Sequence, residues 1–142
     1  SYFIYGGLVF QILSLNFLET WDEWWENAPP EFIYAYYNSH RSKDRQQIVV
    51  LTQILADESN VGYEKLFNES IVSVNGVAPR DMLDFVQRVR DSVGVVELRT
   101  SYGGHIVLDC EKTREANQRI LERYHIHAAV SEDLQLPDSK AP

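Results

Sequence analysis

The chain has 142 residues, of which 44% are hydrophobic and 24% charged, and its 13 basic and 21 acidic side chains give a net charge of −8. That length suits one globular domain. The acidic balance argues against a nucleic-acid interface and against docking on anionic lipid, because both need clustered Lys and Arg. No apolar run reaches the roughly 20 residues of a membrane span, and no secretory signal is visible. The chain starts with Ser1 and strand-like residues follow at once, so we expect a piece of a longer protein.

Two strands open the predicted fold. Residues 2–13 are aromatic, aliphatic and β-branched, and they are interrupted by Gly6-Gly7, which predicts a glycine turn or bulge between the strands. Apolar side chains then recur at helical spacing at Leu15, Leu18, Trp21 and Trp25. Pro30 favours the first turn of another helix, which we expect to run to about Asn38, before a polar loop over 39–47.

The second half of the chain alternates strands with helices. Residues 48–55 and 70–74 read as strands, with a turn at 57–60 and a short helical turn within 61–68 between them. An amphipathic helix is predicted over 79–91, two strands around a turn over 95–100 and 105–110, and a final helix over 111–124. Cys110, the only cysteine, is expected to end the last strand as an inert buried thiol.

This order of elements predicts an α+β domain with a small antiparallel sheet. We place the domain at 1–136, with an aromatic-rich helical insertion at 15–47 and a C-terminal helix and extension at 111–136. Residues 137–142 are expected to be a flexible tail.

The motif SIVSVNG at 70–76, the element order from 48 to 109, and the pieces YGGLVFQ and QILADESNVGYE resemble the PDZ domains of Deg/HtrA serine proteases. The likeness is strongest to the last PDZ-like domain of the plant type. It implies a PDZ-like small β-sandwich or open barrel. Two departures stand out: the insertion between the second and third strands, and Asn68-Glu69 in place of the usual Gly-Asp.

The resemblance also implies a peptide groove. Residues 5–8 would be the carboxylate-binding loop, residues 8–12 the free strand edge and residues 82–89 the helix, so that an extended peptide could add as a strand. The candidate residues are Tyr5, Gly6, Gly7, Leu8, Val9, Phe10, Met82, Phe85, Val86 and Val89. The alternative is that the helical stripe simply packs the core. We also expect the insertion or residues 126–136 to cover or fill this groove.

The chain offers no evident catalytic or metal chemistry. The nucleophile motif GNSGG of the Deg/HtrA family is missing, and no Ser, His and acidic constellation stands out. Of the four histidines, only His125 and His127 are close in sequence, and we expect both to lie in a polar loop. We predict no catalytic residue, no metal ligand and no cofactor.

The insertion is unusually rich in aromatic residues. Exposed Trp and Tyr are typical of interface hot spots, so an assembly surface is one interpretation. The other is a satellite core beneath the insertion. The candidate interface residues are Trp21, Trp24, Trp25, Tyr36 and Tyr37.

Together these features predict a non-catalytic regulatory domain that supports oligomer assembly or allosteric control of an attached serine endopeptidase. Its partners would be that protease domain and neighbouring subunits of a homo-oligomer. The alternative function is capture of hydrophobic or unfolded peptide C-termini, or of an internal segment, by strand addition.

Overall fold

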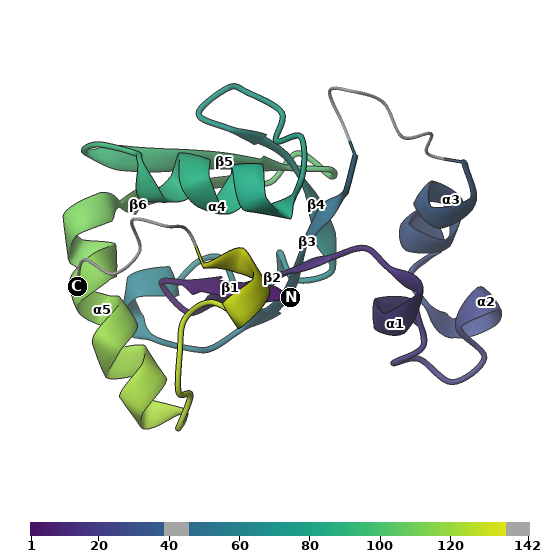
Figure 1. Cartoon of the computed structure of the whole chain (residues 1–142), viewed down its shortest axis with the longest axis horizontal. Coiled ribbons are helices and arrows are strands. Elements are labelled where there is room, and N and C mark those ends of the chain that lie inside the picture. The colour runs from purple at the N-terminus through teal and green to yellow at the C-terminus, as the bar shows by residue number, and fades with distance from the viewer. Residues whose placement is uncertain (39–45, 136–142) are drawn as a thin grey trace.

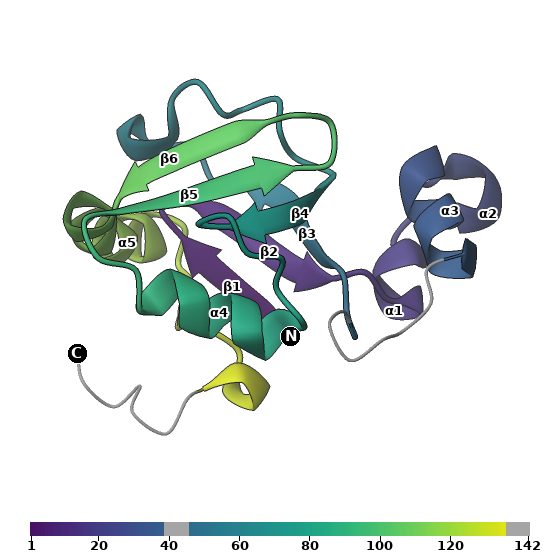
Figure 2. The same cartoon turned by 90° about the horizontal axis from the view of Figure 1, so that it is seen from above.

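The computed structural model describes residues 1–38 and 46–135. One antiparallel sheet of six strands has the order β1–β2–β3–β4–β5–β6, so every strand pairs with its neighbours in sequence. Figures 1 and 2 show this sheet curving around the core, with helices at its sides. The predicted α+β PDZ-like fold is confirmed. The strands are β1 (Tyr2–Tyr5), β2 (Leu8–Ile12), β3 (Val49–Ile54), β4 (Glu69–Val74), β5 (Val95–Thr100) and β6 (His105–Asp109).

The first two strands form a tight hairpin. Tyr5 pairs with Leu8, which leaves only Gly6 and Gly7 in the turn. Both have positive φ, at +61° and +83°. A two-residue turn of this kind needs positive φ at both positions, which glycine adopts without steric cost. The glycine turn predicted between two strands is therefore present.

The part of the insertion up to residue 38 holds three short helices: α1 (Leu15–Leu18), α2 (Trp24–Asn27) and α3 (Pro30–Asn38). They project from one side of the sheet in both views (Figures 1 and 2). The helical spacing predicted from Leu15 to Trp25 is interrupted, because the Thr20 hydroxyl donates to the Phe17 carbonyl and Glu23 is left-handed at φ 49°. The helix predicted at Pro30 is confirmed. Most of the expected loop at 39–47 falls outside the described residues.

Helix α4 (Met82–Arg90) lies along the side of the sheet (Figure 2). The helix was predicted to begin at Pro79, but it begins at Met82. Asp81 has an extended backbone and caps the helix, because its side chain accepts the Asp84 N–H at 2.7 Å. Its apolar face enters the main core. There the ring of Phe85 packs 4.8 Å from that of Phe10.

The last helix, α5 (Cys110–Arg123), contacts both β1 and β6 and so closes the curved sheet across its two outer strands. Its start corrects the prediction that Cys110 ends a strand. Asp109 is the last residue of β6, and its side chain caps the helix by accepting the Lys112 N–H at 2.9 Å. Cys110 is therefore the first helical residue, and it is buried as expected.

Two single-turn 3₁₀ helices complete the fold. The first, η1 (Glu58–Asn60), sits where a turn was predicted, and the Asp57–Asn60 capping box fixes its start. Residues 61–68, where a short helical turn was expected, form hydrogen-bonded turns, with the Leu66 N–H donating to the Tyr63 carbonyl at 3.0 Å. The second, η2 (Glu132–Leu134), follows α5. The predicted tail at 137–142 is outside the described residues. Within 1–38 and 46–135, none of the helices combines the length and apolarity needed to cross a membrane.

Candidate functional site

The edge of β2 that was predicted to receive a peptide is occupied by the chain itself. On one side β2 pairs with β1, with Phe10 opposite Phe3. On the other side it pairs with β3, with Phe10 opposite Leu51. Strand β1 thus holds the position that an added peptide strand would take on β2.

The apolar stripe of α4 faces this built-in strand. Phe85 contacts Phe3 of β1 edge-on, with 6.2 Å between ring centroids, as well as Phe10 of β2. None of the four stripe side chains is more than 1% exposed. These side chains therefore pack the core, as the alternative interpretation predicted for Met82, Phe85, Val86 and Val89. The assignment of the ten groove residues to peptide binding stays a prediction, and for those on β2 and α4 it requires β1 to leave.

Both main-chain polar groups of Gly6 are engaged by side chains. The Gly6 N–H donates to Asn117 Oδ1 of α5 at 2.7 Å, and the Gly6 carbonyl accepts from Asn60 Nδ2 at 3.0 Å. A main-chain N–H bound in this way cannot also hold a carboxylate. Just before the turn, the Tyr5 ring is buried, and burial raises the pKa of its hydroxyl above the ordinary value.

A buried carboxylate ties the neighbouring loop to α5. Asp57 accepts from Arg119 Nε and Nη2 at 3.1 and 2.7 Å, and from Arg123 Nη1 at 3.2 Å. The hydrogen bonds from Arg119 hold the pKa of Asp57 well below its usual range. Local sequence patterns do not indicate this cluster, because 62 residues separate Asp57 from Arg119. The one available signal was the spacing of the two arginines, which places them on one helix face.

The outer edge of β1 is covered by residues that follow α5. The Ile4 N–H donates to the Ala129 carbonyl at 2.7 Å, the Ser131 N–H donates to the Tyr2 carbonyl at 3.0 Å, and Phe3 bridges to Val130. The 126–136 segment was expected to cover or fill the groove. In its described part, residues 129–131 lie along the outer edge of β1, η2 contacts α4, and Leu134 joins the main core. The chain thus places two of its own segments beside β2 in succession.

The aromatic residues of the insertion divide into two groups. Phe32 is only 1% exposed and lies in a small core with Leu18, Ala28 and Val50, onto which Trp21 packs. The second group is named here the aromatic patch and consists of Trp24, Trp25, Tyr36 and Tyr37. Trp25, Tyr36 and Tyr37 are exposed, whereas Trp24 is half-buried and also packs onto the small core.

Within the aromatic patch the rings contact one another. Trp24 stacks on Tyr37, with 5.9 Å between centroids and 26° between planes, and meets Tyr36 edge-on at 5.6 Å. Trp25 and Tyr37 remain 58% and 64% exposed. The satellite core thus accounts for the buried part of the insertion, and the assignment of Trp21, Trp24, Trp25, Tyr36 and Tyr37 to an interface stays a prediction.

Residues of the metal-ligating types are scattered over the described part of the chain. Over 1–38 and 46–135, no three side chains of His, Cys, Asp or Glu come together in a way that could hold a metal ion. His125 is exposed just after α5, at a left-handed φ of 58°, and His127 is exposed beside it, in line with the polar loop expected there.

Comparison with known proteins agrees with this architecture. The sequence pattern of the PDZ domain family matches residues 1–133. "Protease Do-like 2, chloroplastic" of Arabidopsis thaliana is 33% identical over 141 residues, covering 96% of this chain and 22% of that protein. "Serine protease DegP homolog" of Plasmodium falciparum is 30% identical over 90 residues, covering 63% of this chain and 10% of that protein. The chain spans about a fifth of the length of the plant relatives it matches.

Proposed function

The chain belongs to the PDZ domain family and is an interaction module related to the Do-like proteases, and from that premise we propose that its role is assembly. The aromatic patch would dock on a neighbouring subunit or on the protease domain of a parent serine endopeptidase. Through this contact the domain would support a homo-oligomer or control the protease allosterically.

The observation that carries this proposal is the exposure of three rings of the aromatic patch, those of Trp25, Tyr36 and Tyr37, beside a buried core. Phe32 and Leu18 already anchor the insertion to Val50 of β3, so the fold does not need the outer rings for anchorage. Trp and Tyr that stay exposed and contact one another are typical of interface hot spots. The filled edge of β2 supports the same role, because it leaves the usual peptide position unavailable.

Peptide capture is the second candidate function, and it is favoured by the shortness of the segment that pairs with the outer edge of β1. Within the described residues, 129–131 lie along its outer edge, held by the main-chain hydrogen bonds of Ile4 and Ser131 and by the Tyr2 N–H, which donates to Ser131 Oγ at 2.9 Å. A hydrophobic peptide C-terminus could displace this segment and add to β1 as a strand. If β1 itself moved away, a peptide could add to β2 at the predicted groove residues.

Sedimentation of the chain, and of the longer protease that carries it, tests the assembly role. The double variant Trp25→Ala/Tyr37→Ala should shift the sedimentation profile toward smaller species, because each ring removed is exposed and available to a partner. Tyr34→Ala is the matched control, since Tyr34 lies on the same helix and is 69% exposed but is outside the aromatic patch. An unchanged oligomer in the double variant would count against the assembly role.

The capture role has its own test. Amide NMR would follow a titration of the labelled chain with a hydrophobic peptide, with the amidated peptide as control. Shifts at residues 2–4 and 129–131 would support capture on β1, whereas shifts at 5–12 and 82–89 would support the predicted groove. No shift at millimolar peptide would argue against both.

A further inference from the structure

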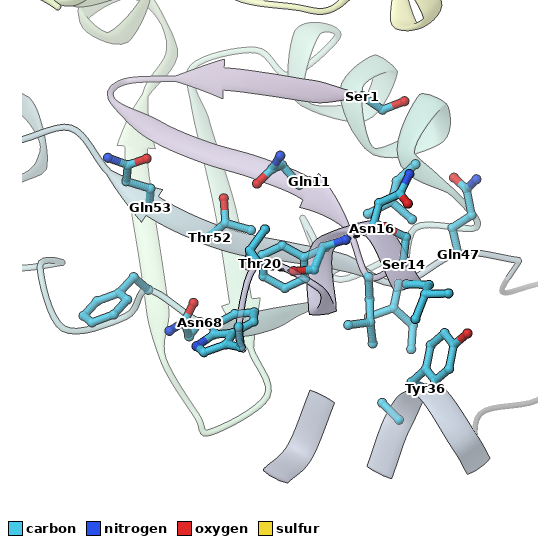
Figure 3. A pocket seen from close by; sticks show the side chains of 18 of the residues that line it. Ser1, Gln11, Ser14, Asn16, Thr20, Tyr36, Gln47, Thr52, Gln53 and Asn68 are labelled. Carbon is cyan, nitrogen blue, oxygen red and sulfur yellow. Dashed lines mark hydrogen bonds between the residues drawn. The ribbon is translucent and has the colours of Figure 1, made fainter. Parts of the chain in front are cut away.

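A groove separates the helical insertion from the outer face of β2 and β3, with a volume of about 960 Å³ (Figure 3). Gln11 of β2 and Thr52 and Gln53 of β3 line one side of it, and Asn16 and Thr20 of the insertion line another. The groove stays open because the two elements that pack on this face of the sheet, helix α5 and the insertion, contact different parts of it. Helix α5 packs near Ile4 and Leu55, whereas the insertion packs on Val50.

The chemistry of the groove is uniform. None of the side chains lining it is charged, although 24% of the chain is. Besides amides and hydroxyls, the lining holds aliphatic side chains and four aromatic rings, namely those of Phe17, Trp21, Tyr36 and Phe67. Each side-chain amide both donates and accepts hydrogen bonds.

Several of these amides are free to bind a ligand. The side chains of Gln11, Asn16, Gln53 and Asn68 make no hydrogen bond to another residue within 1–38 and 46–135. In Figure 3, Gln11, Thr52 and Gln53 follow two adjacent strands, and Asn68 lies beyond them. The unpaired amides therefore extend along the groove.

We propose that this groove binds an extended, uncharged stretch of polypeptide. Its main chain would exchange hydrogen bonds with the amides along the two strands, and its apolar side chains would contact the aromatic rings. A charged side chain would lose hydration here without meeting a counter-charge, so uncharged segments are preferred. The volume falls within the range of about 300–1,000 Å³ typical of ligand sites.

This site goes beyond the assembly role and differs from strand addition. It requires neither the outer edge of β1 nor the exposed ring of Trp25. The two proposals can therefore be refuted separately. Sedimentation of the aromatic-patch variants tests the assembly role, and peptide titration tests binding in the groove.

The test is a titration of the isotopically labelled chain with an acetylated and amidated nonapeptide of serine, glutamine, leucine and phenylalanine. Blocked ends remove any carboxylate-dependent mode. We expect shifts in the side-chain amide signals of Gln11, Gln53 and Asn68. A peptide with glutamate in place of its glutamines should bind at least about tenfold more weakly, because burying its charges is costly.

Variants locate the binding. Gln11→Ala and Gln53→Ala should each weaken it about fivefold through the loss of hydrogen bonds. Gln118→Ala, on the exposed face of α5, should leave it unchanged. Three results would overturn the proposal: shifts confined to residues 2–4 and 129–131, no shifts at millimolar peptide, or stronger shifts with maltohexaose than with the peptide, which would indicate a carbohydrate site.

Discussion

Gly7 approaches Leu55 so closely that a Cβ atom at position 7 would lie 2.4 Å from the Leu55 carbonyl oxygen and 2.5 Å from Asn60 Nδ2. The Leu55 N–H also donates to the Gly7 carbonyl at 2.7 Å, so the two backbones cannot move apart without losing that bond. Gly7→Ala should therefore destabilise the chain by about 3 kcal/mol or more, combining the steric clash with positive φ. Urea unfolding measures this.

Gly76 provides the matched control for that substitution. Its φ of +84° nearly equals the +83° of Gly7, but a Cβ at position 76 would meet nothing within 4 Å. Gly76→Ala should cost only about 1 kcal/mol, the backbone penalty alone. Equal losses in the two variants would show that the approach of Gly7 to Leu55 does not constrain the turn.

Buried and exposed aromatic residues of the insertion should differ sharply in their effect on stability. Phe32→Ala opens a cavity in the small core with Leu18 and Val50, and should lower the free energy of unfolding by about 3–5 kcal/mol. Trp25→Ala removes an exposed ring and should cost less than about 1 kcal/mol. Thermal unfolding of both variants checks the contrast. A large loss from Trp25→Ala would mean that the aromatic patch supports the fold.

The Asp57 cluster should make stability depend on acid pH. The pKa of Asp57 lies below its ordinary value in the folded state, so its contribution is present above about pH 4 and declines as the pH falls further. Asp57→Asn should cost about 2 kcal/mol near neutral pH, because charge-assisted bonds from Arg119 and Arg123 are weakened. Urea unfolding at several pH values should show this difference shrinking below about pH 4.

Glu58→Gln is the control for the Asp57 cluster. The Glu58 carboxylate lies 3.8 Å from Arg119, but its side chain is 85% exposed, so its loss should change stability by less than about 0.5 kcal/mol. A cost for Asp57→Asn that is constant from neutral to acid pH would contradict the assigned role of its carboxylate.

Ser131→Pro should loosen the cover of β1 without straining the backbone. Ser131 already has φ −67°, which suits proline, and the substitution removes the N–H that donates to Tyr2. We expect faster hydrogen exchange at Ile4 and a several-fold gain in affinity for hydrophobic peptides, measured by amide NMR. Ser131→Ala keeps the N–H, so it should retain most of the protection at Ile4. Unchanged exchange in Ser131→Pro would show that residues 129–131 do not hold β1.

Local patterns predicted most elements, whereas contacts between distant segments were not accessible from the sequence. The spacing of Met82, Phe85, Val86 and Val89 gave a helix with one apolar face, and that face is buried. The same pattern cannot say what covers the face, and here Phe3 does. Gly6-Gly7 suits both an anion-binding loop and a tight hairpin, because both need positive φ. The choice depends on Asn60 and Asn117, which lie 54 and 111 residues away.

The groove beside the insertion was missed for a related reason. Gln11 and Thr52 are ordinary outward-facing strand residues in the sequence. Their setting arises only because α5 and the insertion cover different ends of the same sheet face. A single sequence does not indicate which part of a sheet face stays uncovered between two elements that pack on it.

The pairing of β1 with residues 129–131 also bears on the order in which the chain folds. All other strand pairs join neighbours in sequence, and each closes a loop shorter than the one that unites Phe3 with Val130. The entropy lost on closing a loop grows with its length, so this pairing is the least favoured to form early. The outer edge of β1 should therefore be completed last and open first, and amide exchange at Ile4 should report local opening well before the rest of the sheet unfolds.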